Sequence, residues 1–147
     1  MQAKATLPRL GHVALPASDP HRLGGFYRDL LDLQIVRETD HPLAGQEVQL
    51  TGHPLDGSHE LVFFTNPEAR HVAFGVDTRD QLTSYYGRAR EAGVAIPYAH
   101  DSGRAISFFL RDPEDNLVEI YWATGQPRRE NPPISDPAAI HQLVAGA

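Results

Sequence analysis

The chain has 147 residues, of which 41% are hydrophobic and 22% charged, and this composition is typical of one globular domain with a buried core. Its formal net charge of −6 and its lack of a lysine- or arginine-rich run exclude a nucleic-acid-binding protein, and the absence of cysteine excludes disulfides, thiolate metal sites and cysteine nucleophiles. Because no apolar run approaches about 18 residues, we expect a cytoplasmic protein without a membrane span.

The first part of the chain predicts a strand and then a helix. Residues 1–8 have no clear pattern, whereas residues 10–15 are typical of a short buried strand. A helix should begin at Ser18-Asp19-Pro20, because a capping side chain there precedes a proline in the first turn. We expect this helix to pack on a sheet through one apolar face, closely at Gly24-Gly25. That face consists of Leu23, Phe26, Tyr27, Leu30 and Leu31.

Three strands are predicted after this helix. The polar residues 37–45 are interpreted as a loop, and residues 52–57 predict a turn because they contain glycine, proline and aspartate. The strands themselves are expected at 33–36, 47–50 and 59–64.

The second half of the chain repeats the order of strand, helix and three strands. Asp77-Thr78 should begin the helix and Gly93 should end it. After the last strand, residues 125–134 are interpreted as a linker, and a short helix should begin at Ser135-Asp136-Pro137. The four strands are expected at 71–76, 94–98, 105–110 and 117–122.

The two halves also correspond residue by residue, at an offset of 59. Residues 11–15 (Gly-His-Val-Ala-Leu) match residues 70–74 (Arg-His-Val-Ala-Phe), and Glu60 matches Glu119. Two copies are too few for a solenoid, which needs at least about three. We therefore expect two βαβββ units that face each other, each giving a histidine and possibly a glutamate to a shared centre.

The matched histidines are candidate metal ligands. His12 shares its face of the predicted strand with Leu10 and Ala14, because side chains at i and i+2 point the same way. One such histidine is more often a hydrogen-bonded core residue, but two at matched positions, His12 and His71, favour a common site.

Glu119 is the candidate carboxylate ligand, since it lies in an otherwise apolar strand. A buried carboxylate without a partner costs several kcal/mol, and a divalent cation held by two imidazoles removes this cost. Two histidines and one carboxylate suit non-haem Fe(II) best, and Mn, Ni, Zn or Co would also fit.

Glu60 leaves two interpretations open. If its side chain points inward it is a fourth ligand; otherwise it is a carboxylate on a sheet edge or in a salt bridge. His59 should point to the opposite face and so should not be a ligand alongside Glu60.

These motifs resemble the vicinal oxygen chelate superfamily, which includes glyoxalase, extradiol dioxygenases, methylmalonyl-CoA epimerase and bleomycin resistance proteins. The resemblance covers about residues 8–123, and the segment 109–119, with its Asp-Pro turn before Glu119, is its most specific part. It implies an α+β fold in which two paired βαβββ modules form a half-barrel around a divalent metal. In one domain over 1–147, module one would cover about 8–66 and module two about 67–123, followed by a tail over 124–147.

Within the superfamily the sequence is most similar to the small extradiol dioxygenases that bind catechol-type diols. His100, followed by seven residues and then Phe108-Phe109, matches the spacing of their signature, and the resemblance makes it the acid–base candidate. A solvent-exposed loop histidine is the alternative. Phe109 stands where these enzymes have tyrosine, and Phe64 where they often have an acid–base histidine.

Two other functions remain open. A glyoxalase-like lyase or isomerase would use Glu60 with Glu119 to move a proton between adjacent carbons, and a metal-free drug-binding module would need an aromatic cleft. We expect a small-molecule substrate in every case and a homodimer, because open curved sheets leave edges that need covering. The predicted substrate pocket consists of Phe64, Tyr98, Phe109 and Tyr121.

Overall fold

A computed structural model describes residues 6–129, 134–135 and 140–145 of the chain. The backbone divides into two compact units. The N-terminal unit is Gly11–Ala73, and the C-terminal unit is Phe74–Ala147 together with the start of the chain through Leu10. The division falls inside strand β5 (His71–Val76), so the first three residues of β5 belong to the N-terminal unit.

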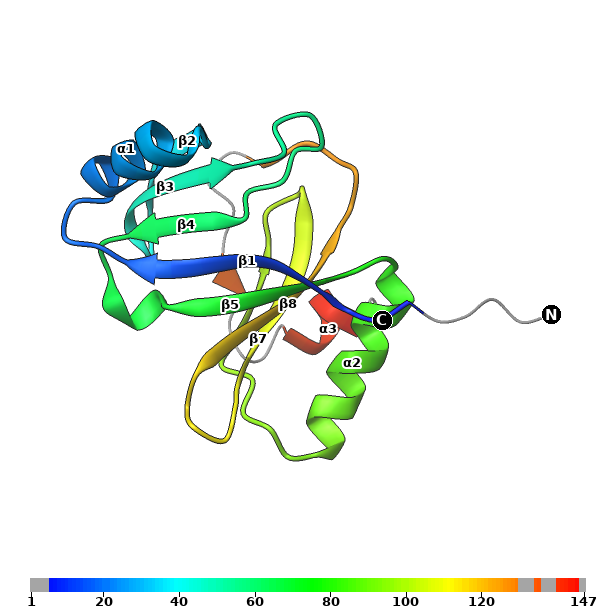
Figure 1. Cartoon of the computed structure of the whole chain (residues 1–147). Coiled ribbons are helices and arrows are strands. Elements are labelled where there is room, and N and C mark those ends of the chain that lie inside the picture. The colour runs from blue at the N-terminus through cyan, green and yellow to red at the C-terminus, as the bar shows by residue number, and fades with distance from the viewer. Residues whose placement is uncertain (1–5, 130–133, 136–139, 146–147) are drawn as a thin grey trace. The chain divides into compact units, whose positions relative to one another are not determined.

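The N-terminal unit has the predicted βαβββ order, and its strands are arranged β2-β3-β4-β1 (Figure 1). Strand β1 pairs in parallel with β4, whereas β3 is antiparallel to both β2 and β4. A short 3-10 helix, η1 (Pro67–Ala69), precedes β5. The elements are β1 (Arg9–Pro16), α1 (Pro20–Leu31), β2 (Gln34–His41), β3 (Gly45–Thr51) and β4 (Leu61–Phe64).

Strand β2 corrects the prediction of a loop over residues 37–45. It pairs with β3 along its whole length, with a register shift between Ile35 and Arg37. Its residues alternate between exposed and partly buried, as expected for the edge strand of an antiparallel sheet. An edge strand tolerates polar residues on both faces, and for this reason its polar composition was misleading.

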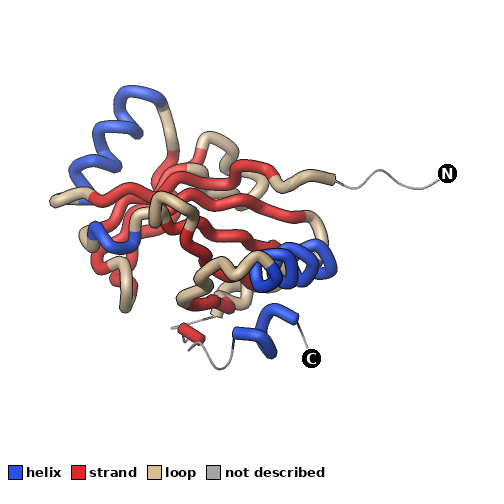
Figure 2. Tube along the Cα trace, turned by 90° about the horizontal axis from the view of Figure 1, so that it is seen from below, coloured by secondary structure: helices blue, strands red, loops and turns tan. Residues whose placement is uncertain are grey.

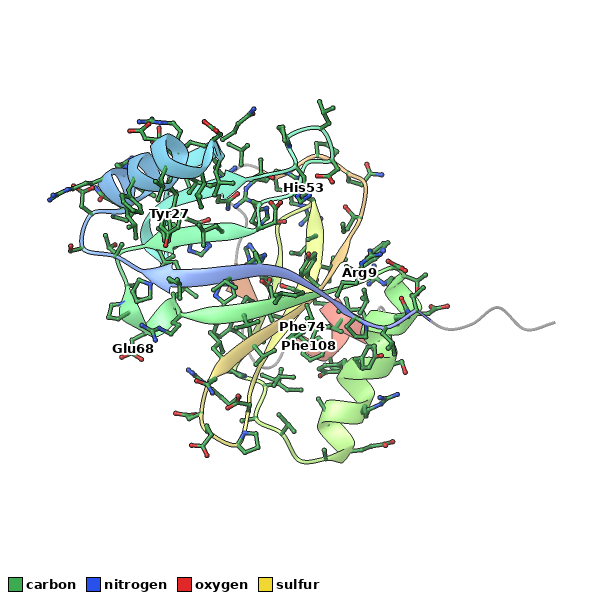
Figure 3. All side chains as sticks on the ribbon, in the orientation of Figure 1. Arg9, Tyr27, His53, Glu68, Phe74 and Phe108 are labelled. Atoms are coloured by element: carbon green, nitrogen blue, oxygen red, sulfur yellow. The ribbon has the colours of Figure 1, made fainter. Side chains whose placement is uncertain are left out.

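Helix α1 begins as predicted, because the Asp19 side chain accepts a hydrogen bond from the backbone N–H of Arg22. Leu23 and Tyr27 pack against the sheet of their own unit, where Tyr27 is labelled in Figure 3. Gly24 permits the closest approach, since an added Cβ would lie 3.0 Å from Cγ1 of Val48. The predicted close packing at this position is therefore confirmed.

The other apolar residues of α1 do not belong to the core. Phe26, Leu30 and Leu31 are 56%, 64% and 55% exposed, so the prediction that they face the sheet was wrong. The buried positions Pro20 and Gly24, together with Leu23 and Tyr27, already form one complete helical face. Of the others, Phe26 points away from this face, whereas Leu30 and Leu31 are exposed in the last turn of the helix.

The C-terminal unit repeats the βαβββ order in β5, α2, β6, β7 and β8, which confirms the α+β class and the two-module prediction. Its strand order is β5-β8-β7-β6-β9. Figure 2 shows the helices in blue and the strands in red. No helix in the described part of the chain is long and apolar enough to cross a membrane. The elements are α2 (Arg79–Glu91), β6 (Tyr98–Asp101), β7 (Ala105–Arg111), β8 (Leu117–Ala123), β9 (Ile134–Ser135) and α3 (Ile140–Ala145).

Helix α2 covers the core of this unit. The side chains of Thr78 and Gln81 form a reciprocal capping box at its start, and Gly93, with φ of +70°, follows its end as predicted. Leu82 is fully buried, and Figure 3 labels Phe108, another fully buried member of this core.

Three boundaries in the C-terminal unit differ from the prediction or extend beyond it. Strand β6 begins at Tyr98 instead of residue 94, and β9 consists of the last residue of the predicted linker, Ile134, and of Ser135, where the helix was expected to start. The predicted C-terminal helix is present as α3, but its expected start at Ser135-Asp136-Pro137 reaches residues outside the described ranges.

Candidate metal centre

The N-terminal unit brings the two matched histidines together. His12 on β1 and His71 at the start of β5 have their Nε2 atoms 3.1 Å apart, with the rings edge to face. His12 is 9% exposed. The ring of Phe64, one of the predicted pocket residues, is stacked parallel to that of His71 at 6.4 Å. The proximity of His12 and His71 expected from the repeat is therefore present, and their role as metal ligands stays a prediction.

The tautomer of His71 favours metal binding by this pair. Nδ1 of His71 donates a hydrogen bond to the carbonyl oxygen of Ala69 at 2.8 Å, so in the neutral ring the lone pair is on Nε2. Metal-bound histidines typically orient their second nitrogen in this way. Two nitrogens about 2.1 Å from one ion and about 90° apart would be roughly 3 Å from each other. The observed separation of 3.1 Å fits such a pair.

Glu60 is held by its own loop. Its carboxylate accepts hydrogen bonds from Thr51 Oγ1 at 2.7 Å and from the N–H of Gly52 at 3.3 Å, and it pairs closely with Nδ1 of His53 (Figure 3 labels His53). Burial would raise the pKa of Glu60, but the bonds from His53 and Thr51 outweigh it and lower this pKa to about 2. This arrangement favours the salt-bridge interpretation over a fourth metal ligand.

In the C-terminal unit, Glu119 lies in a row of side chains that crosses three strands. Residue 119 on β8 is opposite Phe109 on β7, which is opposite Tyr98 on β6. Residues directly opposite each other in an antiparallel pair share a face. The row therefore joins the proposed carboxylate ligand to two of the predicted pocket residues, Phe109 and Tyr98.

The remaining predicted residues lie in the neighbouring row. His100 on β6 is opposite Ser107 on β7, and Ser107 is opposite Tyr121 on β8. The ring of Tyr121 packs on the backbone of Gly75, where an added Cβ would be 2.9 Å from the phenol oxygen. His100 and Tyr121 therefore face the same side of the sheet as Glu119.

Comparison with known proteins identifies the family. Residues 9–120 match the family described as the Glyoxalase/Bleomycin resistance protein/Dioxygenase superfamily. The chain belongs to this superfamily. The matched range includes both histidines and Glu119, and it confirms the resemblance inferred from the motifs.

One curated protein is 31% identical over 123 residues, which are 77% of this chain and 62% of that protein. It is the biphenyl-2,3-diol 1,2-dioxygenase 3 of Rhodococcus globerulus. The chain thus spans less than two thirds of the length of this relative.

Solved structures of three other proteins share the fold. A Mn(II)-bound glyoxalase from Novosphingobium aromaticivorans has a TM-score of 0.65 at 18% identity, with 84% of this chain and 42% of that chain covered. A 2,2',3-trihydroxybiphenyl 1,2-dioxygenase from Sphingomonas wittichii has a TM-score of 0.64 at 16% identity, with 90% and 45% covered. A methylmalonyl-CoA epimerase variant from Streptomyces coelicolor has a TM-score of 0.61 at 18% identity. The match covers 84% of this chain and 100% of that chain.

One residue beside the histidine pair was missed by the sequence analysis. The ring of His59 lies 4.9 Å from the ring of His12, centroid to centroid. In a strand that starts at residue 59, alternation would point His59 to the face opposite Glu60. Strand β4 begins only at Leu61, so this alternation does not apply to His59. The signal that could have found it is the parallel pairing of β1 with β4, which brings the segment before β4 beside His12.

A row of buried polar side chains on β3 was also missed. Glu47, Gln49 and Thr51 are 7%, 7% and 1% exposed, and Nε2 of Gln49 donates to Glu47 at 2.5 Å. Gln49 is opposite Arg37 on β2, whose Nε is buried without a hydrogen-bond partner in the described structure. The sequence predicts a strand at 47–50, but nothing in it indicates that the polar face of this strand is buried.

Proposed function

We propose that this member of the superfamily is a divalent-metal-dependent enzyme that binds two adjacent oxygens of its substrate, in the manner of an extradiol dioxygenase acting on catechol-type diols. His12, His71 and Glu119 would hold the metal, with Fe(II) as the expected ion. The 3.1 Å separation of the two Nε2 atoms carries the proposal, because it suits two ligands of one ion. The 31% identity to a diol dioxygenase supports the substrate class.

The chemistry of the three side chains also fits a metal. Each of His12, His71 and Glu119 offers one ligand atom of the type that a divalent cation binds. A set of two imidazoles and one carboxylate leaves coordination positions open, and the bound metal supplies Lewis acidity to oxygens that occupy them.

His59 is the residue that we assign to proton transfer. Its ring is adjacent to His12, and imidazole titrates near neutral pH, so it can accept the proton that a substrate hydroxyl loses on binding. Such a residue would compensate for Phe64, which stands where a histidine was expected. His100, on the sheet face of Glu119 in the C-terminal unit, remains the second candidate for this role.

The test is anaerobic reconstitution with Fe(II), followed by oxygen and a panel of catechol and biphenyl-2,3-diol. We expect a yellow ring-opened product that disappears in His71→Ala. The matched control is His21→Ala, because His21 is an exposed histidine that contacts only Glu38 among the described partners. Equal product from both variants would contradict the proposal.

The glyoxalase-like alternative receives less support from the geometry. It requires Glu60 as a ligand, and the carboxylate of Glu60 is engaged by His53, Thr51 and Gly52. Isomerisation of a hemithioacetal by the Ni or Co form, without ring cleavage by the Fe(II) form, would favour this alternative. Tight binding of a planar antibiotic by protein that takes up no metal would favour a drug-binding module.

A further inference from the structure

Position 109 lacks the hydroxyl that a tyrosine would offer beside Glu119. The row across β6, β7 and β8 brings a different hydroxyl to the same face, because Tyr98 is directly opposite Phe109. Neighbouring strands are about 4.8 Å apart, so the backbones of Tyr98 and Glu119 are separated by roughly 10 Å. Long side chains on a common face can bridge such a distance.

The Tyr98 side chain leans over its neighbour in this row. Its ring centroid is 4.5 Å from that of Phe109, and the two planes are inclined by 36°. Burial, and secondly the charge of Glu119, raise the pKa of Tyr98 to about 12. The phenol therefore remains protonated at neutral pH, so it is available as a hydrogen-bond donor.

We propose that Tyr98 supplies, from strand β6, the hydroxyl donor that position 109 lacks, and that it binds the substrate oxygen nearest to Glu119. The inference rests on the proposed function, because it requires a substrate oxygen at that place. A neutral O–H donates a stronger hydrogen bond to an ionised diol oxygen than to a neutral one. Tyr98 therefore favours the ionised form of the diol.

Tyr121 is the competing phenol. It follows Glu119 by two residues on the same strand and so points to the same face. Its ring, however, packs on Gly75, with the phenol oxygen 2.9 Å from the position of an added Cβ. Tyr121→Phe therefore tests the second hydroxyl of the predicted pocket, and Tyr85→Phe on helix α2 is the matched control away from it.

The experiment measures catechol binding to Mn(II)-loaded protein without oxygen, by difference absorption, so that binding is separated from turnover. Because a hydrogen bond to a charged group is worth about 1.5–3 kcal/mol, Tyr98→Phe should weaken catechol binding about tenfold to a hundredfold. The double variant Tyr98→Phe/Phe109→Tyr should restore the affinity to within roughly threefold, since it returns a hydroxyl to the same row. Tyr85→Phe should bind catechol like the unaltered protein, Tyr121→Phe should lose less affinity than Tyr98→Phe, and Mn(II) affinity should stay constant throughout.

The outcomes separate this inference from the function on which it rests. If the unaltered protein binds Mn(II) and catechol and Tyr98→Phe binds both equally well, only the role of Tyr98 is overturned. A loss in Tyr98→Phe that includes Mn(II) affinity, or that Phe109→Tyr does not restore, assigns Tyr98 to structure and also overturns it. If the unaltered protein binds no catechol, the proposed function fails and the inference fails with it.

Discussion

The two glutamates at matched positions, Glu60 in the N-terminal unit and Glu119 in the C-terminal unit, have different surroundings. Glu60 is bound by His53, which follows strand β3, whereas Asp112, the residue that corresponds to His53, caps its own turn. The side chain of Asp112 accepts hydrogen bonds from the N–H groups of Glu114 and Asn116. A duplicated sequence pattern therefore does not imply a duplicated role, because the turn before each glutamate decides what binds it.

The largest expected effect separates these two carboxylates. Glu119→Gln should weaken Mn(II) binding by more than about a hundredfold. Removing a residue that only hydrogen-bonds to a metal ligand already lowers metal affinity about 10–100-fold, and loss of a ligand should cost more. Glu60→Gln should change it by less than about threefold. Isothermal titration of both variants measures the contrast, and equal losses would make Glu60 a ligand after all.

The second contrast lies between leucines of the two long helices. Leu82 on α2 is 0% exposed and Leu30 on α1 is 64% exposed. Leu82→Ala should lower the free energy of unfolding by about 2–5 kcal/mol, since it leaves a cavity in the core. Leu30→Ala should change it by less than about 0.5 kcal/mol. Urea denaturation measures both, and a large effect at Leu30 would indicate that another surface covers α1.

The third contrast concerns glycines of the same helices. An added Cβ at Gly24 would be 3.0 Å from Val48, whereas at Gly87 it would have no neighbour within 4 Å. Gly87→Ala should stabilise the protein by up to about 1 kcal/mol through helix propensity. Gly24→Ala should instead destabilise it by about 1–2 kcal/mol, because crowding in a packed core exceeds that gain. Thermal unfolding of both variants would reveal stabilisation at Gly24 if the packing there were loose.

The smallest expected effect is the pH dependence of the pair formed by His53 and Glu60. The hydrogen bond with Glu60 raises the pKa of His53 above 6.5. The contribution of His53 to the free energy of unfolding is therefore complete below pH 6.5 and disappears as the pH rises through the raised pKa. The pKa of Glu60 is lowered to about 2, so its contribution is complete above 4.5 and disappears as the pH falls toward 2. His53→Gln should therefore lower the urea midpoint most between about pH 4.5 and 6.5, and a pH-independent difference would contradict the ion pair.

The sequence predicted the order of the elements in both modules and the pairing of the histidines. These predictions succeeded because strand and helix periodicities are local, and because the repeat related His12 to His71. The sequence analysis failed for strand β2, because a polar edge strand has the composition of a loop. It also failed for Phe26, because the exposure of this side chain depends on which helix face meets the sheet. The predicted homodimer and cytoplasmic location stay predictions.

The sequence by itself determined the family and the duplicated architecture, and it named the candidate ligands, because these depend on residue identity and spacing along the chain. Only the tertiary structure decided the surroundings of each candidate. It brought His59 to His12 and closed the loop of His53 onto Glu60. It also brought Tyr98 beside Phe109. These contacts depend on strand register and on where a strand begins, and a change of one residue in either redirects a side chain to the other face of the sheet.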